Sequence, residues 1–212
     1  MMRYVRTVAP AVPVVTAAEA RAQGIGTSAD ADTFVEALVA AATEHLDGRA
    51  GVLGRALVNQ SWRLDVHVAD GCGRVRIDMP NVSSITSIAY VIGGVETTWS
   101  AAEYRLGSVG NFYFVEPKSG YSWPSTDDVE DAIRVTFVTG FGAAGANVPT
   151  PIRQAIILLA KHLYGLTERN LFLARDEVPG VQVHQYVVSE ATGGVIGAAV
   201  DALTAPYRVR KL

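Results

Sequence analysis

The chain has 212 residues, of which 49% are hydrophobic and 18% are charged, and its formal net charge is −3 at pH 7. A chain of this length buries about 70% of the surface it exposes when unfolded, so it can form a substantial core. A weakly acidic chain is a poor candidate for binding nucleic acid by phosphate neutralisation. Its single cysteine, Cys72, excludes an intramolecular disulfide framework and a cysteine-rich zinc site, and is typical of a protein made in a reducing cytoplasm.

Two uncharged segments imitate membrane signals. Thr7–Ala18 follows two arginines, but Pro10 and Pro13 interrupt it, so we do not expect a signal peptide. Val135–Ile152 is long enough to span a bilayer, but it contains three glycines and two prolines, which a lipid-exposed helix would not tolerate together. The sequence therefore predicts a protein without a membrane partner.

The N-terminal third is predicted to be extended and then helical. Pro10 and Pro13 block a helix before residue 15. Thr16-Ala17-Ala18-Glu19 is a capping-box pattern, which predicts a short helix up to about Gln23. A second helix is predicted to start between residues 28 and 32 and to end at Gly48, because apolar residues recur at helical spacing: Phe34, Leu38, Ala42 and Leu46.

The middle of the chain has the two-residue period of β-strands. From Val58 to Val68 the even positions are mostly apolar and the odd positions polar, which predicts a strand with one buried face. Gly93-Gly94 predicts a tight hairpin turn. The other predicted strands are Arg74–Met79, Ile85–Ile92, Val95–Trp99, Tyr104–Leu106, Phe112–Val115 and Ile133–Thr139.

The last third is predicted to be helical again. A helix begins near Pro151, Arg169–Gly194 is predicted to be an irregular excursion, and a last helix covers about Val195–Leu203. Two helical ends that are each apolar on one face bury those faces most simply against each other. The prediction is an α+β fold, in which N-terminal arm and helices (1–53) and C-terminal helices and tail (148–212) form a helical body around an inserted antiparallel β domain (54–147), sandwich or barrel-like.

Two glycine-rich motifs imitate a dinucleotide-binding loop. Gly140–Gly145 fits G-x-G-x-x-G, but Pro149 and Pro151 delay the next helix, and no later strand completes a parallel βαβ unit. Gly24–Ala29 matches a looser form and follows a helix. We interpret Gly140–Gly145 as a strand-to-helix connection, with nucleotide binding as the minor alternative, and expect no cofactor.

The remaining polar residues give no catalytic or metal-binding pattern. His45, His67, His162 and His184 lie far apart in the sequence without the spacing of metal ligands. The acidic run Asp127-Asp128 with Glu130 and Asp131 could hold a cation but lacks the ligand pattern of a calcium loop, so a solvated loop is the simpler interpretation. Trp62, Trp99, Trp123 and Tyr121 are interpreted as core or interface residues. These observations give no support for an enzyme.

An ordered set of short segments nevertheless resembles one family along nearly the whole chain. The segments are Val14–Ala20, Phe34–Ala42, Gly54–Leu57 with Gln60–Trp62, Met79-Pro80, Ile85–Ile88 with Tyr90, Gly120–Pro124, Thr139–Gly142, Val148-Pro149 with Pro151–Ile156, and Leu203 with Pro206–Arg208. Each is weak alone, but their order and spacing are similar to those of the head–tail connector proteins of tailed phages and of phage-derived gene transfer particles.

The resemblance implies a non-enzymatic adaptor ring, commonly of twelve copies, that joins the portal to the tail-side neck proteins, such as a stopper. Double-stranded DNA would pass through the ring without sequence-specific binding, and the particle would be assembled in the cytoplasm of a bacterial host. In this family the C-terminal segment is thought to dock onto the portal. The matching positions here are Pro206, Tyr207, Arg208, Val209, Arg210, Lys211 and Leu212.

The chain departs from the family pattern at Gly24–Thr27, where the first helix is expected to end early, and in the poorly matched Arg169–Gly194. Two alternatives stay open. The chain could be another neck or tail-completion protein, a stopper or terminator, or the β segment could be a module that binds a ligand such as carbohydrate.

Overall fold

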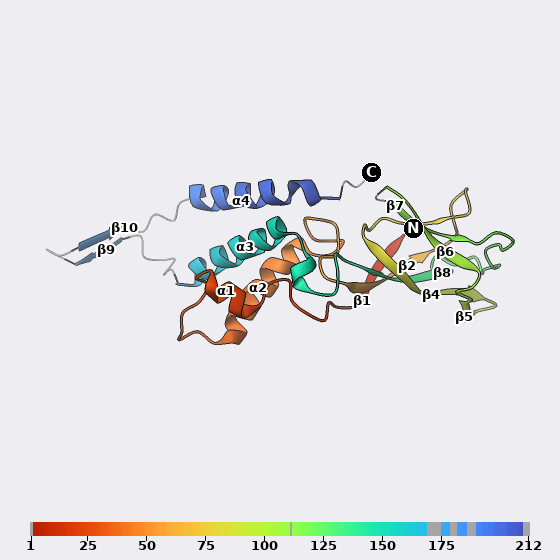
Figure 1. Ribbon diagram of the computed structural model, residues 1–212, viewed down its shortest axis with the longest axis horizontal. Coiled ribbons are helices and arrows are strands. Elements are labelled where there is room, and N and C mark those ends of the chain that lie inside the picture. Colours follow the sequence, from red (N-terminus) through yellow and green to blue (C-terminus); the bar gives the residue numbers. More distant parts are fainter. Residues whose placement is uncertain (1, 111, 169–174, 179–181, 186–189, 210–212) are drawn as a thin grey trace. The chain divides into compact units, whose positions relative to one another are not determined.

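The computed structural model describes residues 2–110, 112–168, 175–178, 182–185 and 190–209. The chain divides into two compact units, which are described separately. A β unit contains residues 1–13, 47–148 and 209–212, and a helical unit contains residues 14–46 and 149–208. Thus the first residues of the chain and Val209 belong with the inserted β segment, whereas the helices on either side of that segment form one body, as the α+β prediction requires (Figure 1).

The β unit is built on two antiparallel sheets. The larger sheet has the order β1-β2-β8-β4-β5, and the smaller has the order β3-β7-β6. The strands are β1 (Arg3–Val8), β2 (Gln60–Val66), β3 (Val75–Ile77), β4 (Val82–Ile92), β5 (Val95–Trp99), β6 (Tyr104–Val109), β7 (Phe112–Pro117) and β8 (Ile133–Thr139). The described strands do not close into a barrel.

One hydrophobic core joins the two sheets. Trp62 and Leu64 of β2 and Phe137 of β8 are buried in the same cluster as Ile77 of β3 and Val115 of β7. The alternation predicted for β2 is confirmed, because Gln60, Trp62, Leu64 and Val66 are all buried. Asp65 is buried as well, on the other face, where it accepts two hydrogen bonds from Arg63.

The helical unit contains α1 (Ala17–Ala22), α2 (Asp32–Leu46), α3 (Thr150–Glu168) and α4 (Glu190–Thr204), with the 3₁₀ turn η2 (Ala205–Tyr207) after α4. The 3₁₀ turn η1 (Gly145–Asn147) lies in the β unit, before α3. Helix α2 packs on α1 and α3, and α3 packs on α4. The predicted capping box is confirmed: Thr16 Oγ1 accepts from the Glu19 backbone N at 3.2 Å, and Glu19 Oε2 accepts from the Thr16 backbone N at 2.9 Å.

Three sequence predictions need correction. The prediction placed Phe34 and Leu38 on the buried face of α2, but both lie at its margin. The buried residues are Val35, Val39, Ala42 and Leu46. Phe34 instead contacts Tyr164 of α3, ring edge to ring face, with 6.4 Å between the ring centroids. The excursion is not wholly irregular, because β9 (Arg175–Val178) and β10 (Gln182–Gln185) pair antiparallel within it. Finally, α4 begins at Glu190, five residues before the predicted start.

Candidate assembly surfaces

The predicted docking segment leaves the helical unit directly after α4. Thr204 is fully buried, and its hydroxyl donates to the Val200 carbonyl at 2.8 Å in the last turn of the helix. Pro206 and Tyr207 lie in η2, and Arg208 forms an ion pair with Asp201. These contacts fix the beginning of the segment.

Val209 attaches the segment to the β unit. Its backbone N donates to the Leu53 carbonyl at 2.9 Å. Of the seven residues predicted to dock, Arg208 and Val209 thus have partners within the chain, while Pro206 is exposed and Tyr207 half-buried. Arg210, Lys211 and Leu212 lie outside the described residues.

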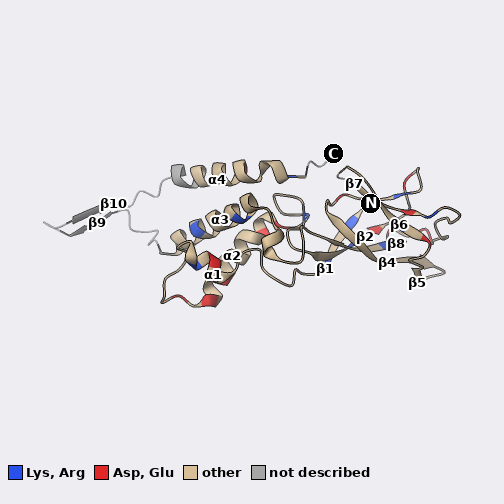
Figure 2. Ribbon diagram, in the orientation of Figure 1, with Lys and Arg blue, Asp and Glu red and all other residues tan. Residues whose placement is uncertain are grey.

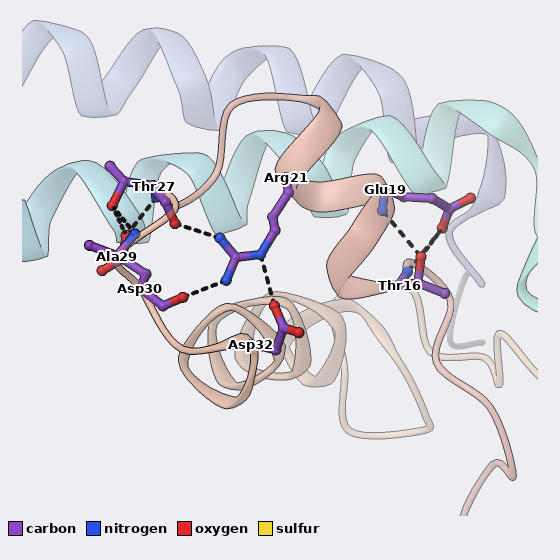
Figure 3. A network of polar contacts seen from close by, with 7 residues as sticks. All are labelled: Thr16, Glu19, Arg21, Thr27, Ala29, Asp30 and Asp32. Atoms are coloured by element: carbon purple, nitrogen blue, oxygen red, sulfur yellow. Dashed lines mark hydrogen bonds and ion pairs between the residues drawn. The ribbon is translucent and has the colours of Figure 1, made fainter.

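The segment Gly24–Ala29 is organised by one arginine (Figure 3). Arg21 donates from Nε to Asp32 Oδ1 at 2.9 Å and from its two terminal nitrogens to the carbonyls of Thr27 and Asp30, both at 2.6 Å. Hydrogen bonds from the Thr27 backbone N and hydroxyl hold the pKa of Asp30 below its usual value. Helix α1 ends at Ala22, which agrees with the early end expected from this departure from the family pattern.

Gly140–Gly145 connects β8 to the helices, and its backbone forms hydrogen bonds with the segment before β2. The Phe141 N donates to the Leu57 carbonyl at 2.8 Å, and the Asn59 N donates to the Gly142 carbonyl at 2.9 Å. No α-helix begins inside the motif, since α3 starts at Thr150 and only the 3₁₀ turn η1 begins at Gly145. Side-chain atoms are excluded at Gly140 because a Cβ there would lie 2.5 Å from the Asn59 N. Close backbone packing therefore accounts for Gly140, whereas a Cβ at Gly142 would lie 2.6 Å from the Asn147 side chain.

Three acidic residues between β7 and β8 each interact with a nearby group. Asp127 accepts from the backbone N atoms of Gly93 and Gly94, at 2.9 and 2.7 Å, and these bonds lower its pKa. Asp128 Oδ1 lies 2.7 Å from His67 Nε2, and Asp131 pairs with Arg134. The run therefore supports the turn between β4 and β5, and no metal-binding group of three or more His, Cys, Asp or Glu occurs among the described residues.

The tryptophans are in the core or packed against it. Trp99 is 5% exposed and lies 4.7 Å from Trp123 and 5.3 Å from Tyr104 between ring centroids. Trp123 Nε1 donates to the Gly73 carbonyl at 2.7 Å. Tyr121, by contrast, is exposed.

One surface was not found by sequence reasoning. The outward face of the β3-β7-β6 sheet carries what we call the arginine face: Arg74, Arg76, Arg105, Val109, Phe112, Phe114 and Glu116. The guanidinium of Arg74 lies 4.4 Å from the centroid of the Phe114 ring, and that of Arg76 lies 4.9 Å from the Phe112 ring. Arg74 and Arg105 both donate to Glu116, which lowers the pKa of that carboxyl.

Strand register brings the side chains of this face together. Phe114 stands opposite Gly107 of β6, and a Cβ at Gly107 would lie 2.4 Å from the Phe114 ring. The missing side chain therefore lets Phe114 lie against the sheet, with Arg74 stacked on it. In the sequence, the signal was the alternation of Arg74 and Arg76 and of Phe112 and Phe114, but only the register places these residues side by side.

A buried polar group holds the start of the inserted segment. Asp47 accepts from the Leu57 backbone N at 2.7 Å and from Gln60 Nε2 at 2.9 and 3.0 Å. Burial raises the pKa of the Asp47 carboxyl, against the opposing effect of these hydrogen bonds. These bonds hold Asp47 against Leu57 and against Gln60, the first residue of β2.

Comparison with known proteins identifies the fold. No protein-family model matches the chain, and no curated protein matches it. Among solved structures, a chain from the neck of an empty gene transfer agent particle, computed with sixfold symmetry, matches all of this chain and 97% of its own length, with a TM-score of 0.67 and 24% identity. The chain therefore has the fold of a gene transfer agent neck protein.

Two further structures share this neck-protein fold. One is a chain from the virion of a native gene transfer agent particle, with a TM-score of 0.68 and 23% identity over 99% of this chain and 96% of the other. The second is from the neck of a native particle computed with twelvefold symmetry, with a TM-score of 0.61 and 22% identity over 100% and 97% of the two chains. Among the described residues, no helix is long and apolar enough to cross a membrane.

Proposed function

We propose that this chain is a non-enzymatic structural protein of the neck of a phage-like particle. In the finer form of the proposal it is the adaptor, which forms a ring of about twelve copies between the portal and a stopper or other tail-side protein. The observation that carries the proposal is the match over the full length of chains from gene transfer agent necks, in particles computed with sixfold and twelvefold symmetry.

The charge of the chain is compatible with a DNA conduit. Each phosphate that a protein neutralises adds salt-dependent affinity, which would slow the passage of double-stranded DNA. A net charge of −3 avoids a strong attraction of this kind. The proposal therefore includes passage of DNA without sequence-specific binding.

The portal contact is assigned to Pro206–Leu212. Arg208 is paired with Asp201 and Val209 is bonded to Leu53, so these residues support the segment from the protein side. The segment also contains Arg210 and Lys211, and we propose that their positive charges contact the portal. Surface charges mainly set the rate and specificity of association, and reversing them weakens it.

A charge-reversal pair tests this assignment. Arg210→Glu with Lys211→Glu should reduce co-sedimentation with the portal protein of the same genome by about tenfold, a loss of about 1.4 kcal/mol. The control is Arg3→Glu with Lys161→Glu, which changes the net charge equally at two exposed positions elsewhere. Deleting residues 207–212 should abolish binding and leave the protein folded. Normal binding by the deletion variant would show that the segment is not the docking site.

A stopper or terminator is the other neck position that the fold would suit. In this proposal the adaptor contacts the portal directly, whereas a stopper or terminator would have other neighbours. Binding to the bare portal therefore separates the adaptor from these two.

A further inference from the structure

The arginine face has the composition of a protein interface. Val109 and Phe112 are 67% and 47% exposed, which is unusual for large apolar residues on a solvent-facing sheet. Three arginines on the face outnumber the two carboxylates they touch, Glu116 and Asp78. Arginine and aromatic residues are the types enriched at the centres of protein interfaces.

The arginines are also held in position before any partner binds. Stacking of Arg74 on Phe114 and of Arg76 on Phe112 restricts these long side chains. An ordered guanidinium loses less conformational freedom when it forms a bidentate bond to a carboxylate. The face is therefore suited to a partner that offers carboxylates next to apolar side chains.

The same β unit carries a surface of that chemistry, which we call the acidic tip: Ile92, Val95, Asp128, Val129 and Glu130. Its three apolar residues are 45%, 63% and 40% exposed, in sequence order, and the Asp128 side chain is 96% exposed. Glu130 is exposed too. Charged residues are marked on the ribbon in Figure 2.

The acidic tip has a fixed structure. The bonds from Gly93 and Gly94 to Asp127 hold the acidic run against the β4–β5 turn, and the Val91 N donates to the Ala132 carbonyl at 2.9 Å. The neighbouring acids, Glu96 and Asp131, are paired with Arg134. Asp128, beside His67, and Glu130 therefore supply the negative charge of the tip.

We propose that the arginine face of one copy binds the acidic tip of the next copy in the ring. This inference rests on the proposed function, because a closed ring needs two unlike and complementary surfaces on each subunit. Positive charge with exposed Val109 and Phe112 on one surface matches negative charge with exposed Ile92, Val95 and Val129 on the other. DNA is a poorer fit to the face, since Glu116 and Asp78 would repel phosphates and the apolar side chains would stay uncovered.

Site-directed cross-linking tests the contact. In a Cys72→Ser background, which removes the free and exposed thiol, one variant carries Phe112→Cys and a second carries Val129→Cys. The two are mixed, with and without the portal protein, and treated with a short bismaleimide. Because the contact joins unlike surfaces, the mixture should give about tenfold more covalent dimer than either variant alone. The control replaces Val129→Cys with Val8→Cys, at a valine that is 58% exposed.

The outcomes separate this inference from the proposed function. Portal loading without the mixed cross-link would refute the contact and leave the adaptor function standing. A mixed cross-link in the concentrated protein without portal loading would support the contact and refute the adaptor function. No mixed cross-link under either condition, or as much dimer from a single variant as from the mixture, would overturn the inference. So would binding of a fluorescent DNA duplex that Arg76→Glu abolishes.

Discussion

Replacing Gly140 with alanine tests the structural role of Gly140–Gly145 most sharply. Gly140 has a φ of +153°, and an alanine Cβ there would lie 2.5 Å from the Asn59 N and 2.6 Å from the Val58 carbonyl carbon. Both atoms belong to backbone that is hydrogen-bonded to the segment after β8, through Asn59 and Gly142. They cannot move aside as the end of a flexible side chain could.

The expected loss of stability is large. A backbone conformation reserved for glycine costs about 1–3 kcal/mol, and overpacking of a rigid site costs about 1–3 kcal/mol more. We expect Gly140→Ala to lower the free energy of unfolding of the β unit by roughly 4 kcal/mol, from the sum of these two ranges. At about 2–4 °C per kcal/mol for a chain of this size, Tm should fall by about 8–16 °C.

Differential scanning calorimetry and denaturation by guanidinium chloride would measure this change. Gly71→Ala is the matched control in the same unit, because a Cβ at Gly71 would meet no atom within 4 Å. The control should remain within about 0.5 kcal/mol of the wild type. If Gly140→Ala has wild-type stability, the packing argument is wrong. A nucleotide-binding loop would instead lose ligand affinity with little change in Tm.

Substitutions at three further positions test other parts of the account. Burial raises the pKa of Asp47, so the stability that its protonated form contributes at low pH is lost as the pH rises through that pKa. Asp47→Asn should therefore flatten the dependence of the free energy of unfolding on pH, measured by urea titration between about pH 4 and 8. Asp47→Ala should cost about 1–3 kcal/mol for each donor left unpaired, at Leu57 and Gln60. Thr16→Ala should cost about 1 kcal/mol through the lost helix cap, while Thr16→Ser should retain the wild-type Tm. Gly165→Ala, inside α3 with open space around it, should raise stability by about 0.5–1 kcal/mol in the same melting assay.

Local signals predicted many elements correctly. The capping box placed the start of α1, and Gly93-Gly94 placed the β4–β5 turn, because both patterns act over a few residues. The alternation of β2 also identified its buried side chains, since one face of that strand packs in a dense core. The signals themselves lie in residues that are close together in the sequence.

Features set by partners far along the chain were not predicted in full. The segment before Pro10 was expected to be extended, but only its pairing with β2 makes it the edge strand β1. β4 begins at Val82, three residues before the predicted start, where its pairing with β8 contains irregular register. The arginine face likewise depends on the register of β3, β7 and β6, which no local pattern reveals.

The measurement that tests the central proposal most directly is the native mass of this protein mixed with the portal protein from the same genome. The adaptor account predicts a stable complex with one copy of this chain per portal subunit, about twelve in all. If no complex forms at micromolar concentrations of both proteins, the chain does not bind the portal, and the adaptor account is contradicted.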